Sequence, residues 1–152
     1  EACAILGVNE CRFLDRTDGQ LLEDGGAAAE LSRSVDVKAY SVILCPWPYE
    51  KHGDHKAACI ILMEALKNAG HDAELWLYEV WSPLLPNRVL DISAAAERKR
   101  QALLCYKSQL VYIDYVSAAV GLGKYRSINI PGATDVEAYI VERFSQLKRL
   151  RL

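Results

Sequence analysis

Residues 40–68 of the chain read YSVILCPWPYEKHGDHKAACIILMEALKN, and this stretch decides the fold class. Its first part, Tyr40 to Cys45, is a continuous apolar run of the kind found in buried parallel strands, and two prolines end it. From Lys56 to Asn68 the apolar residues follow a helical period instead, and Gly70 supplies a common helix stop. A buried strand, a polar loop and a helix in this order predict an α/β protein.

The same alternation continues on both sides of this stretch. Val136 to Val141 is compatible with a last strand or with the start of a helix that runs into the basic tail. We expect a three-layer α/β/α, Rossmann-like domain with a mostly parallel sheet, formed as a single domain by residues 1–152. The further predicted helices are a first one that stops at Gly7, Ala27 to Arg33, Ala94 to Lys107 and about Asp114 to Tyr125; the further predicted strands are Cys11 to Leu14, Glu74 to Val80 and Arg88 to Ile92.

Composition argues against several classes of protein. The 152 residues include 18 basic and 20 acidic ones, so no broad basic field is available for nucleic acid or anionic lipid. No apolar run approaches the roughly 20 residues that a membrane-spanning helix needs. Five widely spaced cysteines without a Cys-x-x-Cys pair indicate reduced thiols and argue against a structural zinc knuckle. We expect a cytoplasmic protein that neither binds nucleic acid nor spans a membrane.

Residues 46–55 place a polar loop with aromatic residues between the buried strand and the long helix, where α/β proteins carry their sites. His52 and His55 are three positions apart with Asp54 between them. An imidazole can bind a metal, and a carboxylate can fix the tautomer of a ring. Alternatively, Asp54 caps the helix and both histidines are ordinary loop residues. Spacing alone leaves both open, because a catalytic zinc normally takes three protein ligands.

The segment from Pro46 to Ala58 ends in His-Gly-Asp-His-Lys-Ala-Ala. It resembles the His-Pro-Asp-His-Arg-Ala-Ala segment of the LmbE-like or PIG-L de-N-acetylases, with Gly53 in place of the common proline. The likeness covers nearly the whole chain. It includes Leu6-Gly7-Val8, Asp18-Gly19, Leu77-Tyr78-Glu79-Val80-Trp81, Asp91-Ile92-Ser93, Asp114-Tyr115 and Gly121 to Arg126.

The resemblance implies zinc-dependent removal of the N-acetyl group from an N-acetylglucosamine-type amino sugar or conjugate. In that family the residue matching His55 is a zinc ligand. The residue matching His52 stabilises the oxyanion and protonates the leaving amine, and the one matching Asp54 orients that histidine. Asp18 matches an acidic residue that holds sugar hydroxyls, although a simple Asp-Gly turn explains it as well. Tyr49 is a candidate for the sugar pocket.

The resemblance also has a gap. In that family the other zinc ligands and the general base come from an early His-Pro-Asp-Asp-Glu segment, which this sequence lacks. The third histidine, His71, follows Gly70 in a predicted turn and is expected to be a loop residue rather than a replacement ligand. We therefore expect an N-terminally incomplete domain, with the other zinc ligands supplied by a segment absent here.

Two functions follow from this. One is a zinc N-deacetylase, and the other is a catalytically incomplete fragment or a non-enzymatic binding domain with the same fold. In both, the expected partner is a small N-acetylated amino sugar or conjugate, and the sequence leaves a homo-oligomer open.

Other enzyme classes fit less well. A phosphate-binding loop ending at Gly123-Lys124 would need glycine at Ala118 and serine or threonine at Tyr125. A His-Asp phosphohydrolase would need the order opposite to Asp54-His55.

Overall fold

The computed structural model describes residues 1–149. The chain forms two compact units: the first contains residues 1–13 and 89–137, and the second contains residues 14–88 and the segment that starts at Ala138. The prediction of one domain over residues 1–152 stays a prediction, and the last residues of the basic tail, 150–152, lie outside the described part. Among the helices of residues 1–149, none is both long and apolar enough to cross a membrane.

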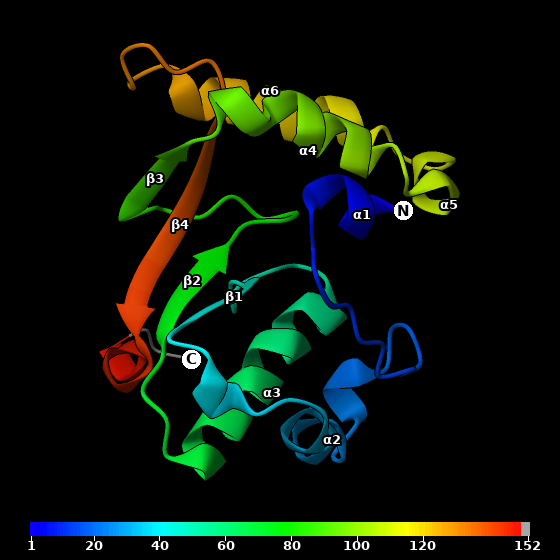
Figure 1. Ribbon diagram of the computed structural model, residues 1–152, viewed down its shortest axis with the longest axis vertical. Coiled ribbons are helices and arrows are strands. Elements are labelled where there is room, and N and C mark those ends of the chain that lie inside the picture. The colour runs from blue at the N-terminus through cyan, green and yellow to red at the C-terminus, as the bar shows by residue number, and fades with distance from the viewer. Residues whose placement is uncertain (150–152) are drawn as a thin grey trace. The chain divides into compact units, whose positions relative to one another are not determined.

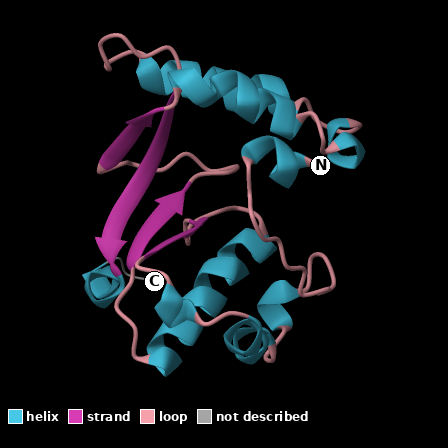
Figure 2. Ribbon diagram, viewed as in Figure 1, coloured by secondary structure: helices cyan, strands magenta, loops and turns pink. Residues whose placement is uncertain are grey.

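The sheet is mixed rather than mostly parallel. Its strands are β1 (Val42–Pro46), β2 (Glu74–Tyr78), β3 (Arg88–Asp91) and β4 (Val136–Arg143), in the order β1-β2-β4-β3 (Figures 1 and 2). β1 and β2 are parallel, with Cys45 opposite Leu77, whereas β2 and β4 are antiparallel, with Trp76 opposite Val141. The α/β class is therefore confirmed and the mostly parallel sheet is not. An apolar run in the sequence indicates that a strand is buried, but it does not indicate whether the strand is parallel or antiparallel to its neighbours.

In the second unit, α3 (Gly53–Ala69) packs against β1 and against α2 (Ala27–Ser34) (Figure 1). The apolar period of the sequence places one face of α3 in the core. In β2 the alternation is strict, because Leu75 and Leu77 are fully buried. Short 3-10 helices, η1 (Leu21–Glu23), η2 (Val37–Ala39) and η4 (Phe144–Arg149), complete this unit. The buried residues of α3 are Ala57, Cys59, Leu62, Ala65 and Leu66.

The two ends of α3 have different caps. His52 is the N-cap, and its ring accepts a hydrogen bond from the backbone N–H of Asp54. The alternative interpretation, in which Asp54 caps the helix, is therefore wrong. At the other end Gly70 has φ 62°, a left-handed conformation that glycine adopts without steric cost. The His52 cap therefore ties the end of the loop before α3 to the first turn of the helix.

The first unit is mostly helical. It contains α1 (Ala2–Leu6), η3 (Ser93–Ala95), α4 (Ala96–Leu103), α5 (Lys107–Leu110) and α6 (Tyr115–Ser127). The helix predicted over Ala94 to Lys107 is interrupted after Leu103, and Tyr106 lies outside the helical region with ψ 54°. Of the two alternatives left open for Val136 to Val141, the structure has the strand, within β4.

The predicted strand over Cys11 to Leu14 is wrong. These residues belong to no ladder, and Phe13 is 81% exposed, so the short apolar run has no partner to bury it. All five cysteines are free, as their spacing predicts. A hydrogen bond with Cys59 and burial raise the pKa of the Cys45 thiol, which keeps it protonated in the core.

Candidate functional site

The candidate site lies where the loop after β1 enters α3. β1 ends at Pro46, and the next backbone N–H, that of Trp47, donates to the carbonyl oxygen of Tyr78 at the end of β2 at 2.9 Å. The carboxyl ends of two parallel strands therefore meet beside the loop, as in other α/β sites. The centroids of the His52 and His55 rings are 4.8 Å apart. The fold thus brings together the two histidines that the sequence singled out.

His52 is held in one tautomer by its neighbour. Its Nδ1 accepts the backbone N–H of Asp54 at 3.3 Å. A neutral imidazole that accepts at one nitrogen carries its proton on the other, so Nε2 is the N–H of this ring. A helix cap therefore also produces a hydrogen-bond donor at the site.

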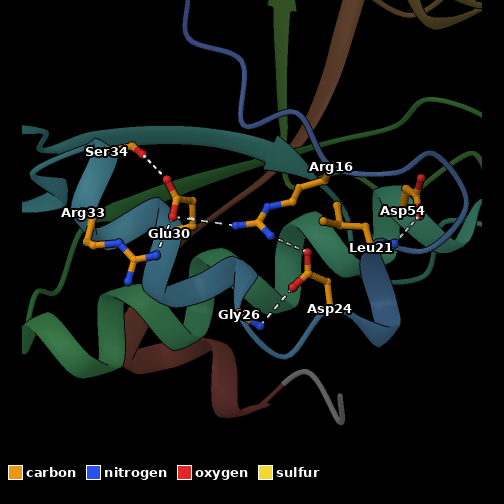
Figure 3. A network of polar contacts seen from close by, with 8 residues as sticks. All are labelled: Arg16, Leu21, Asp24, Gly26, Glu30, Arg33, Ser34 and Asp54. Atoms are coloured by element: carbon orange, nitrogen blue, oxygen red, sulfur yellow. Dashed lines mark hydrogen bonds and ion pairs between the residues drawn. The ribbon is translucent and has the colours of Figure 1, made fainter.

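The Asp54 carboxylate is turned toward the loop before η1. It accepts the backbone N–H groups of Gly19 at 2.7 Å and Leu21 at 3.1 Å, the second of which is drawn in Figure 3. The Gly19 N–H holds the pKa of this carboxyl below its usual range. The resemblance assigns Asp54 to the orientation of His52, and the hydrogen bond between the two residues runs through the Asp54 backbone rather than through its carboxylate.

The loop that Asp54 holds is fixed at its other end by ion pairs. The Arg16 guanidinium lies 3.0 Å from the Asp24 carboxylate and 3.8 Å from that of Glu30 in α2 (Figure 3). Asp24 also accepts the backbone N–H of Gly26 at 3.0 Å. The Arg33 guanidinium, in turn, lowers the pKa of Glu30. These contacts tie residues 16–26 to α2, and Asp54 ties the same loop to the start of α3.

Asp18 lies in this loop, at the turn that its sequence predicts. Gly19 has φ 77°, the left-handed conformation expected after aspartate in an Asp-Gly turn, and Asp18 is exposed. The turn interpretation is confirmed. Because Gly19 contacts Asp54, the same turn places Asp18 next to the candidate site, and its role toward sugar hydroxyls stays a prediction.

Glu50 belongs to the site and was not predicted from the sequence. Its side chain is fully buried. It accepts the backbone N–H groups of Val80 at 2.7 Å, Trp81 at 3.0 Å and Ser82 at 3.3 Å, together with the indole N–H of Trp47 at 3.1 Å. These four donors compensate the buried negative charge and join the loop after β1 to the loop after β2.

Trp81 is the second residue that sequence reasoning missed as part of the site. Its indole meets the His52 ring edge-on at 5.0 Å between centroids and the His55 ring at 5.6 Å. Trp81 remains 47% exposed, so one part of the indole is open to a ligand. Tyr49 is also 47% exposed and packs edge-on against Trp47, which reaches the core.

The residues present do not form a complete metal site. Within residues 1–149, no three His, Cys, Asp or Glu side chains are arranged to hold an ion. His55 offers imidazole nitrogens, but the carboxylates of Asp54 and Glu50 already accept backbone N–H groups. A catalytic zinc needs three protein donors. The described donor set therefore does not fit zinc by itself.

No protein-family model matches the sequence. Among solved structures, the conserved protein TT1542 from Thermus thermophilus is similar, with a TM-score of 0.79 and 26% identity over 91% of this chain and 68% of that one. N,N'-diacetylchitobiose deacetylase from Pyrococcus horikoshii has a TM-score of 0.74 and 18% identity over 95% of this chain and 61% of that one. The A40926 pseudoaglycone deacetylase has a TM-score of 0.63 and 22% identity over 94% of this chain and 67% of that one.

The chain shares the fold of these proteins. It spans about two thirds of their length or less, from 61% to 68%. The same fold also occurs in the 4-carboxy-2-hydroxymuconate hydratase of Pseudomonas putida KT2440, with a TM-score of 0.56 and 20% identity over 92% of this chain and 67% of that one. Deacetylases and a hydratase share one fold, so the fold alone does not fix the reaction.

Proposed function

We propose that the chain carries part of the site of a de-N-acetylase of the LmbE-like or PIG-L type, which hydrolyses the N-acetyl group of an amino sugar or conjugate. Two observations support this: the fold is that of named deacetylases, and the Nδ1 of His52, at the start of α3, accepts the Asp54 N–H, which leaves Nε2 as the donor of the ring. The second observation carries the proposal, because it concerns this chain's own chemistry.

Amide hydrolysis needs a donor at two moments. The carbonyl oxygen becomes negative when the tetrahedral intermediate forms, and the leaving amine has to gain a proton. The Nε2–H of His52 can serve both steps, and the Asp54 N–H on Nδ1 holds the ring in place. Since Asp54 is itself anchored to Gly19 and Leu21, this donor is preorganised rather than free to rotate.

The surroundings suit an amino sugar. The half-exposed indole of Trp81 lies against both histidine rings and offers an apolar face on which a sugar ring can pack. The Asp18 carboxylate, in the turn held by Asp54, can accept hydrogen bonds from sugar hydroxyls, and Tyr49 is proposed to line the same pocket. An N-acetylglucosamine-type group meets these requirements.

Zinc is part of this proposal only as a cofactor to which His55 would contribute one donor. We expect His55→Ala to abolish zinc retention in a preparation that holds zinc, whereas His52→Ala should keep the metal and lose turnover. Elemental analysis of both variants measures this difference. Equal loss of zinc in both would contradict the two separate roles.

A non-enzymatic binding domain is the second candidate function. It is favoured by the finding that the described residues provide no set of three metal donors. Both candidates predict that an N-acetylated amino sugar binds beside His52 and Trp81. They differ in turnover alone, so an assay of acetate release separates them.

The experiment is acetate release from N,N'-diacetylchitobiose and from N-acetylglucosamine by the purified chain. His52→Ala should lower turnover at least about 100-fold, because general acid catalysis contributes about 10²–10⁴-fold. His71→Ala is the matched control. His71 lies away from the site, where its Nε2 is 2.8 Å from the Tyr40 carbonyl oxygen, so this substitution should leave turnover unchanged. Binding without acetate release would favour the second candidate. Release that is insensitive to His52→Ala would refute the assigned chemistry.

A further inference from the structure

The two histidines of the site have different neighbours at Nδ1. The Nδ1 of His52 faces a donor, the backbone N–H of Asp54. The Nδ1 of His55 faces an acceptor, the Oε2 atom of Glu50, at 3.7 Å. It is a buried nitrogen without a hydrogen-bond partner among the described residues. At 3.7 Å the two atoms are within ion-pair range but are farther apart than in a hydrogen bond.

We infer that Glu50 is a positioning residue that fixes His55 in the tautomer opposite to that of His52. A buried carboxylate is only an acceptor, so the nitrogen that faces it must carry the proton. His55 is then protonated on Nδ1 and offers an Nε2 lone pair, whereas His52 offers an Nε2–H. The site therefore contains one histidine acceptor and one histidine donor with ring centroids 4.8 Å apart. This inference rests on the proposed function, deepens it and concerns the same site.

The Glu50 carboxylate cannot turn away from His55. Its Oε1 accepts Trp47 Nε1 at 3.1 Å, Val80 N at 2.7 Å and Ser82 N at 3.3 Å. The Trp81 N–H is shared between Oε1 at 3.2 Å and Oε2 at 3.0 Å. The Oε1 atom thus accepts most of the N–H groups of the two loops, and Oε2 is the oxygen nearest to His55. Because the side chain is fully buried, water does not compete for the hydrogen bonds of either carboxylate oxygen.

This division between the two oxygens makes Glu50→Gln a specific test. The glutamine carbonyl oxygen can keep all four N–H donors at the Oε1 position, because the Trp81 N–H also reaches Oε1 at 3.2 Å, and the NH₂ group then stands at the Oε2 position. An NH₂ group donates to His55 Nδ1 instead of accepting from it. The substitution should therefore move the His55 proton from Nδ1 to Nε2 while leaving the tautomer of His52 unchanged. A residue that only braces the two loops would not produce this exchange.

The measurement is a long-range ¹H–¹⁵N correlation spectrum of ¹⁵N-histidine-labelled protein at a pH where the rings are neutral. The chain has only 3 histidines, so three ring patterns are expected. His71 is an internal reference, because its Nε2 faces the Tyr40 carbonyl oxygen at 2.8 Å and must carry the proton. His52 should show the pattern of His71, and His55 should show the reverse pattern.

Glu74→Gln is the matched control. Glu74 accepts the indole N–H of Trp76 at 2.8 Å in β2, as Glu50 accepts that of Trp47, and the same substitution there should change none of the three patterns. A wild-type His55 protonated on Nε2 would overturn the inference without any variant. An unchanged His55 pattern in folded Glu50→Gln protein would overturn it too. Neither readout depends on turnover, so failure of the proposed function and failure of this inference are distinguishable.

Discussion

Asp54→Ala tests whether the loop before η1 is held by α3. In the structure the carboxylate accepts two backbone N–H groups, from Gly19 at 2.7 Å and from Leu21 at 3.1 Å. Both bonds are charge-assisted but lie near solvent, so we assign about 1 kcal/mol to each, at the low end for charged acceptors. Together they stabilise the closed loop by about 2 kcal/mol, which corresponds to about a thirtyfold change in an equilibrium constant.

Native-state amide hydrogen exchange measures this loop directly, because local opening exposes individual N–H groups. In Asp54→Ala the protection factors of the Gly19 and Leu21 amides should fall by about thirtyfold. The control is Asp72→Ala, since Asp72 accepts the Ser145 N–H at 2.8 Å in the same manner and should affect that amide only. Unchanged protection of Gly19 and Leu21 in Asp54→Ala would refute the reasoning.

The same bonds predict a pH dependence. The pKa of Asp54 is lowered in the folded protein, chiefly by the Gly19 N–H. A group with a depressed folded pKa stabilises the protein at pH values above its unfolded pKa, and this contribution is lost as the pH falls through the folded pKa. The difference in protection between wild type and Asp54→Ala should therefore be full above about pH 5 and disappear in strong acid.

Three further substitutions have defined outcomes. Gly53→Pro should stabilise the protein by about 0.4–1 kcal/mol in thermal or urea unfolding. Proline suits the first turn of α3, and the preceding residue, His52, already has the extended ψ of 128° that a residue before proline adopts. A loss of stability would contradict this prediction. Gly70→Ala should cost about 1 kcal/mol in the same assays, because φ is 62°, and a neutral result would count against that conformation. Trp81→Ala should weaken binding of N,N'-diacetylchitobiose, measured by calorimetry, by about tenfold, as expected for loss of an aromatic contact. Unchanged affinity would show that Trp81 does not contact the ligand.

The sequence predicts the parts of the fold that depend on local periodicity. The helical period from Lys56 to Asn68 corresponds to α3, and the apolar run from Tyr40 to Cys45 corresponds to β1. The approach of His52 to His55 also follows from local structure, because residues three apart at the start of a helix lie on one side of it. These features need no information about distant residues.

The direction of β4 and the interruption after Leu103 depend on tertiary contacts. β4 follows a helix, and strand–helix alternation favours a parallel strand, but its pairing with β2 is antiparallel. Between α4 and α5 the sequence has neither glycine nor proline, so no local signal marks the change at Tyr106. Propensity is a weak guide where tertiary packing decides the backbone.

Glu50 and Trp81 join the site through contacts across about thirty positions of sequence. The hydrogen bond from Val80 N to Glu50 has a separation of 30 residues. A single glutamate in a loop is normally solvent-exposed, so its burial cannot be read from the sequence. The polar loop after β1 could be predicted as the location of a site, whereas the residues that organise it could not.

The central claim is that an N-acetylated amino sugar binds at the start of α3, beside His52, His55 and Trp81. A titration of ¹⁵N-histidine-labelled protein with N,N'-diacetylchitobiose tests it most directly. The ring resonances of His52 and His55 should shift together and saturate, while those of His71 should stay in place. Saturating binding that moves His71 alone, or that moves no histidine, would contradict the claim.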